Sequence, residues 1–141
     1  MESLIDEIAH EQKRDPLAFR KDLLKNYPRY LSVLKTVENK SEWSKPAVKG
    51  VGKGVAVCER SGTYVAYVVE AAVEDGKVRV YRVVCAVDCG LAVDPNGVRA
   101  QIESSVVFGL TMALYGEITM DGGVVKQSNF DDYKMLRIKE M

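Results

Sequence analysis

The feature that most constrains the fold is a change in hydrophobic periodicity near residue 50. Before it, apolar residues such as Leu4, Ile5, Ile8 and Ala9 recur at the spacing of an amphipathic helix. After it, runs such as GVAVCER and GTYVAYVVEAAV are rich in β-branched and aromatic residues, which favour strands. The chain therefore predicts helices first and a sheet second.

Local signals divide the helical part into three helices. Asp15 followed by Pro16 is typical of an N-cap with proline at the first helical position, so a second helix begins there. Tyr27-Pro28 ends that helix, and a third follows with Tyr30, Leu31, Leu34 and Val37 at helical spacing. We expect a helical subdomain over residues 1–45, followed by a polar, glycine- and lysine-rich linker.

The remainder predicts two hairpins and one long helix. Glu74-Asp75-Gly76 joins two strand-like runs, and Asp121-Gly122-Gly123 joins the segments YGEITM and VVKQSNF. Between them, Asp94-Pro95 opens a helix that extends to about Leu114. The predicted class is α+β: a helical N-terminal segment, then residues 46–141 as a mostly antiparallel sheet packed on one long helix.

Composition narrows the function classes. Lys plus Arg equals Asp plus Glu at 20 each, so nothing indicates a nucleic-acid partner. No apolar run approaches the roughly 20 residues that span a bilayer, and the amphipathic, acidic N-terminus is unlike a secretory signal. On an extended strand Cys85 and Cys89 would lie about 13 Å apart, too far for one disulfide or one metal. We therefore expect no metal ligands here.

Several possible sites have simpler structural interpretations. The glycines of GVGKG precede a strand, whereas phosphate-binding loops follow a strand and open a helix, so a flexible entry to the sheet is favoured. His10 is the only histidine, and a surface position is expected for it. The adjacent acids Asp6-Glu7 and Asp131-Asp132 point in different directions on regular elements and are expected to be solvated.

Gln101 is a stronger candidate because it interrupts an apolar helix face. Its neighbours on that face, at spacings of three and four, are Val98, Ser105, Phe108 and Met112. A buried amide that lacks hydrogen-bond partners costs about 1–3 kcal/mol, so a ligand or a neighbouring loop must satisfy it. The residues alone favour the loop.

The segment RVVCAVDCGLAVDPNGVRAQIESSVVFGLTMALYGEITMDGGVVKQSNFDDYKMLR resembles the molybdopterin-binding large subunits of the xanthine oxidase family. It is most similar to the isoquinoline 1-oxidoreductase beta-subunit type, and practically all 141 residues are covered. The resemblance implies hydroxylation of an N-heterocyclic or aldehyde carbon with oxygen from water. It also implies a molybdopterin cytosine dinucleotide carrying Mo in the parent enzyme.

By this resemblance, Gln101 matches a glutamine that hydrogen-bonds the molybdopterin, which favours a cofactor contact over the loop. Ser128, Asn129 and Phe130 match a segment near the substrate funnel, whereas Ser104-Ser105 replaces the commoner Gly-Gly. The implied partners are the remainder of the large subunit, a [2Fe-2S] small subunit that takes up the electrons, and a small-molecule substrate.

The family's catalytic glutamate lies in a Gly-Glu-Pro motif, which would fall beyond Met141 and does not occur here. We therefore expect the isolated chain to be inactive and to bind no cofactor. The alternative is a free-standing, non-catalytic binding or interaction module with the same fold. The sequence predicts neither the substrate, the oligomeric state nor the compartment, which is cytoplasmic or periplasmic in such subunits.

Overall fold

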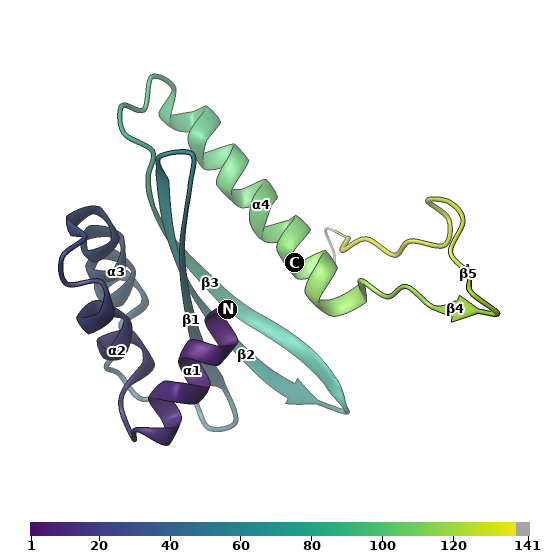
Figure 1. Cartoon of the computed structure of the whole chain (residues 1–141), viewed down its shortest axis with the longest axis horizontal. Helices are drawn as coiled ribbons and strands as arrows, with labels where there is room; N and C mark the ends of the chain where they lie inside the picture. The colour runs from purple at the N-terminus through teal and green to yellow at the C-terminus, as the bar shows by residue number, and fades with distance from the viewer. Residues whose placement is uncertain (138–141) are drawn as a thin grey trace. The chain divides into compact units, whose positions relative to one another are not determined.

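The computed structural model describes residues 1–137, which divide into two compact units, residues 1–91 and 92–137 (Figure 1). The first unit holds three helices and a three-stranded sheet, and the second holds one long helix and a two-stranded hairpin. The α+β class is therefore confirmed.

The three predicted N-terminal helices are present. They are α1 (Glu2–Glu11), α2 (Pro16–Leu23) and α3 (Pro28–Ser41). As expected from the sequence, Asp15 caps α2, because its Oδ1 accepts the backbone N–H of Ala18 at 2.7 Å. Pro28 begins α3, and Glu42, with φ of 53°, ends it in the left-handed conformation.

The sheet is antiparallel, as predicted, and its strands lie in the order β1–β2–β3. Its strands are β1 (Gly52–Arg60), β2 (Thr63–Glu74) and β3 (Lys77–Asp88). The turn between β2 and β3 contains Asp75 and Gly76, with φ of 50° and 72°. Two successive positive φ angles match the right-handed twist of a hairpin, which explains the Asp-Gly pair.

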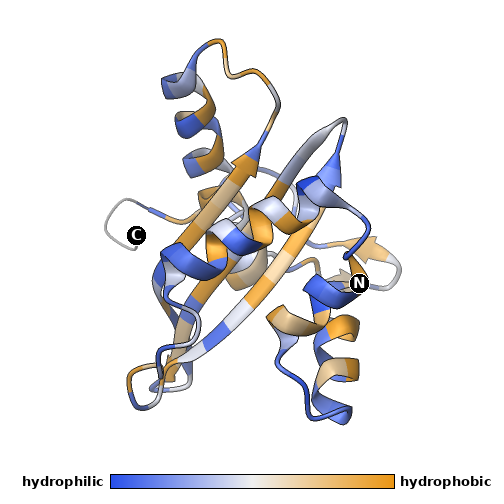
Figure 2. Ribbon diagram, turned by 90° about the vertical axis from the view of Figure 1, so that its left-hand side faces the viewer, coloured by the Kyte–Doolittle hydropathy of each residue, from blue (hydrophilic) through white to orange (hydrophobic). Residues whose placement is uncertain are grey.

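One apolar core joins the helices to the sheet. Leu17 of α2 and Val33, Leu34 and Val37 of α3 pack with the sheet's inner face, and Figure 2 shows the strands as largely apolar. The sheet residues of this core are Val55, Val57, Ala66, Val68 and Ala86. Within this unit, the helix that packs on the sheet is therefore α3 of the N-terminal segment. The sequence pattern predicts instead that the sheet packs on the long helix that begins after Asp94.

The boundary between the two compact units falls at Leu91–Ala92, away from the predicted boundary near residue 45. The predicted boundary followed from the polar linker, which carries no information on long-range packing. That residues 1–45 and 46–141 fold as two separate domains stays a prediction.

The second unit is built on α4 (Pro95–Tyr115), the long helix that the sequence predicts. The following hairpin is shorter than expected, with β4 (Met120–Asp121) and β5 (Val124–Val125). Beyond these four residues the Gln127 side chain holds the two arms together. It accepts the Thr119 N–H and donates to the Thr119 Oγ1, both at 2.9 Å.

Candidate functional site

Gln101 lies in the N-terminal half of α4, on the face that also carries Val98, Ser105, Phe108 and Met112. The structure differs from the expectation that this face is buried. Gln101 is exposed, and Phe108 and Met112 are 56% and 67% exposed. Ser105 Oγ bonds the carbonyl of Ile102, while no described residue hydrogen-bonds the Gln101 amide. An apolar stripe with one free amide in its middle is therefore open to a ligand or a covering surface.

The start of α4 is fixed by an aspartate and a glycine. Asp94 Oδ1 accepts the Asn96 N–H at 3.1 Å, which confirms the predicted N-cap. A Cβ on Gly97 would lie 2.6 Å from Asp94 Oδ2, so a side chain there would displace the capping carboxylate. The requirement for glycine follows from the cap geometry and has no separate signal in the sequence.

The segment with Ser128, Asn129 and Phe130 forms a tight turn in the second unit. Asp132 Oδ2 accepts both the N–H and the Oγ–H of Ser128, at 3.0 and 3.1 Å. Phe130 is thereby displayed at 89% exposure. Asp132 was expected to be merely solvated, and the structure shows that it organises this turn.

Thr111 ties the chain after this turn to the C-terminal half of α4. It is the one fully buried residue of the helix, and its Oγ1 accepts the Leu136 N–H at 3.2 Å. The Lys134 ammonium lies 4.0 Å from the centre of the Tyr115 ring, which adds a cation–π contact. Neither contact could be found from the sequence, because a threonine in a helix carries no long-range signal.

The cysteines do not form a reactive or metal-binding group in the described part of the chain. Cys85 lies in β3, Cys89 follows the end of that strand, and all three thiols are free. Burial is the largest cause that raises the pKa of both Cys58 and Cys85, so these sulfurs stay protonated thiols. No cluster of three or more metal-ligating side chains occurs among residues 1–137.

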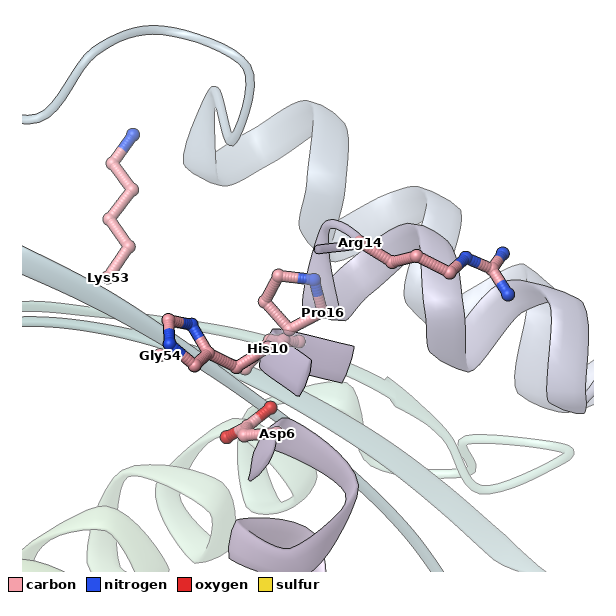
Figure 3. A pocket seen from close by; sticks show the side chains of 7 residues that line it. Asp6, His10, Arg14, Pro16, Lys53 and Gly54 are labelled. Atoms are coloured by element: carbon pink, nitrogen blue, oxygen red, sulfur yellow. The ribbon is translucent and has the colours of Figure 1, made fainter. Parts of the chain in front are cut away.

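A hollow of about 290 Å³ in the first unit contains His10 together with Asp6, Arg14 and Lys53 (Figure 3). Its cations are engaged elsewhere, and Figure 3 shows Arg14 and Lys53 directed away from His10. Arg14 pairs with Asp22, and the Lys53 ammonium donates to the carbonyls of Glu42 and Lys45. Asp6 pairs with Arg20 at 2.6 Å. The hollow therefore presents no free set of groups for catalysis.

Comparison with known proteins identifies the family to which the sequence is similar. Residues 23–141 match the family described as the molybdopterin cofactor-binding domain. The beta subunit of isoquinoline 1-oxidoreductase from Brevundimonas diminuta is 38% identical over 145 residues, covering 99% of this chain and 19% of that protein. Membrane-bound aldehyde dehydrogenase (pyrroloquinoline-quinone) of Gluconacetobacter polyoxogenes is 29% identical over 161 residues, with 99% and 21% covered.

A nicotinate dehydrogenase subunit of Pseudomonas putida is 27% identical over 160 residues, covering 99% of this chain and 13% of that protein. The chain thus spans about a fifth or less of the length of these relatives. Among the described helices, none is both long and apolar enough to cross a bilayer.

Proposed function

The chain belongs to the molybdopterin cofactor-binding domain family, and we propose that it forms part of the cofactor-binding large subunit of a molybdenum hydroxylase. Its substrate would be an N-heterocycle or an aldehyde, in keeping with the names of the relatives. One relative's name gives pyrroloquinoline quinone as cofactor. The family match rests on this chain's own residues and supports molybdopterin instead.

The observation that carries this proposal is the free Gln101 amide on the exposed apolar face of α4. An amide offers two N–H donors and one carbonyl acceptor and adds no charge, so it fits the mixed donors and acceptors of a pterin. Asp94 and Gly97 fix the start of the helix that carries it. We propose that Gln101 binds and orients the cofactor, and that the cofactor is the cytosine dinucleotide form that the family resemblance implies.

When bound, molybdopterin with its molybdenum supplies the chemistry that transfers oxygen from water to an electron-poor carbon and takes up two electrons. A small subunit that carries [2Fe-2S] clusters would accept these electrons. The 141 residues contain no Gly-Glu-Pro motif, since Gly116-Glu117 is followed by Ile118. A general base must lie within hydrogen-bond reach of the proton it takes. The chain by itself is therefore inactive, and the rest of the large subunit supplies the base.

A chimera tests the role of Gln101. This chain replaces the aligned segment in the Brevundimonas diminuta protein, and retained pterin is measured by fluorescence after the cofactor is released. Gln101→Ala removes one or two hydrogen bonds, about 1–3 kcal/mol, so the affinity for the cofactor should fall roughly 5- to 150-fold. Gln12→Ala makes the same change at an exposed position after α1 and should retain the cofactor fully.

Equal retention by the Gln101→Ala and Gln12→Ala chimeras would remove Gln101 from the cofactor site. A chimera that assembles with its small subunit and yet contains no pterin would favour the alternative, a non-catalytic module with the same fold. Pterin retained by the isolated chain would contradict the expectation that it binds none.

A further inference from the structure

The two residues that carry this inference are 59 positions apart. Arg29 lies in the first turn of α3, and Asp88 is the last residue of β3. Arg29 Nε donates to Asp88 Oδ2 and Arg29 Nη2 donates to Asp88 Oδ1, each at 2.8 Å. Nη2 also reaches the backbone carbonyl of Asp88 at 3.2 Å. Two parallel hydrogen bonds fix the orientation of the guanidinium relative to the carboxylate, in addition to the attraction between their charges.

Aromatic packing holds the guanidinium in place. Its central carbon lies 4.3 Å from the centre of the Tyr64 ring, and Tyr30 meets the same ring edge-on at 4.8 Å. Tyr30 and Tyr64 both pack against the apolar core of the first unit. The orientation of Arg29 is therefore set by the core, which distinguishes this pair from a mobile surface ion pair.

The position of Arg29 is unfavourable for the helix alone. The first turn of a helix carries partial positive charge, which disfavours a cation and favours an anion. The Asp88 carboxylate supplies the missing negative charge at this end of α3. Its hydrogen bond with Arg29 is the main cause that lowers the Asp88 pKa to about 2, and it raises the pKa of Arg29.

Asp88 also shapes the chain that follows it. Its Oδ1 accepts the Gly90 N–H at 3.0 Å, and Gly90 has φ of 76°, a left-handed conformation that suits glycine. The same carboxylate therefore binds Arg29 and closes the turn by which the chain leaves β3. Four residues beyond Gly90, Asp94 caps the helix that carries Gln101.

We infer that Arg29 and Asp88 are positioning residues for the end of β3: α3, through the bidentate pair, fixes the turn at residues 88–90 by which the chain leaves the sheet. This inference does not depend on the proposed function. It is tested on the full chain without cofactor, so its failure and that of the proposed function are distinguishable.

The experiment is amide hydrogen exchange by NMR, with Gly90 as the reporter and Val68, in the core strand β2, as the internal reference. Arg29→Lys keeps the charge and loses the bidentate geometry, so Gly90 should exchange about three- to tenfold faster while Val68 is unchanged. Arg79→Lys alters the Arg79–Glu74 pair near the β2–β3 turn and is the matched control. It should leave Gly90 at the wild-type rate.

Asp88→Asn separates the two roles of the carboxylate. The asparagine oxygen can still accept the Gly90 N–H, but the ion pair is lost, so exchange should accelerate as in Arg29→Lys. The double variant should be no faster than either single variant, because both remove the same interaction. The inference is overturned if Gly90 exchanges at the wild-type rate in Arg29→Lys, or if Val68 accelerates as much as Gly90. It is also overturned if Arg79→Lys accelerates Gly90 equally, or if the effects of Arg29→Lys and Asp88→Asn add in the double variant.

Discussion

Leu34→Ala should destabilise the helices and the sheet of the first unit together. Leu34 is fully buried between α3 and the sheet. Loss of three buried carbons at about 0.8 kcal/mol each removes about 2.4 kcal/mol, and the cavity left behind adds to this. We expect a loss of about 3–4 kcal/mol in the free energy of unfolding. At about 4–8 °C per kcal/mol for a unit of this size, Tm should fall by about 12–32 °C.

The assay is thermal and urea unfolding followed by two probes. Trp43 is the single tryptophan, packs against the core after α3 and reports on the helical segment by fluorescence. Far-ultraviolet circular dichroism reports on the sheet as well. Leu23→Ala is the matched control, because Leu23 is 55% exposed on α2 and should cost less than about 1 kcal/mol.

Two results would refute this reasoning. If Leu34→Ala shifts the midpoint no more than Leu23→Ala does, the packing of α3 on the sheet does not stabilise the unit. If the two probes give separate transitions, residues 1–45 unfold apart from the sheet, as the predicted division of the chain would have it.

Three further predictions follow from single contacts. Arg20→Met should lower the free energy of unfolding in urea by about 2–3 kcal/mol, because Arg20 is 1% exposed and its guanidinium pairs with Glu2 and Asp6. An unchanged free energy of unfolding would show that these ion pairs do not stabilise the fold. Asp88, with its folded-state pKa lowered from 3.8 to about 2, stabilises the fold above pH 4, and this contribution is lost as pH falls toward 2. Asp88→Asn should therefore flatten the stability profile in that window, and an unchanged profile would contradict the assignment. Thr111→Val keeps the shape and loses the hydroxyl, so the Leu136 amide should exchange about fivefold or more faster; unchanged exchange would mean that the bond is not formed in solution.

Local signals predicted most of the elements. Asp15-Pro16 and Asp94-Pro95 each place a helix start where the structure has it, because an N-cap is decided by residues adjacent in sequence. Asp75-Gly76 likewise fixes the hairpin between β2 and β3. These features depend on backbone geometry over a few residues, which amino-acid type largely determines.

Contacts between distant residues could not be predicted in the same way. Nothing near Arg29 indicates that its partner is Asp88, and nothing in the apolar pattern of α3 specifies the sheet that it covers. The candidate site shows the same limit. The pattern around Gln101 predicted a buried face of α4, but burial depends on what covers that face, and Gln101, Phe108 and Met112 are exposed in this structure.

The most direct test of the account is the molybdenum content and isoquinoline oxidation rate of the unmodified chimera, measured beside the isolated chain. We expect the chimera to contain molybdenum and to oxidise isoquinoline, and the isolated chain to show no activity. A chimera that folds and assembles but contains no molybdenum, or an isolated chain that oxidises isoquinoline, would contradict it.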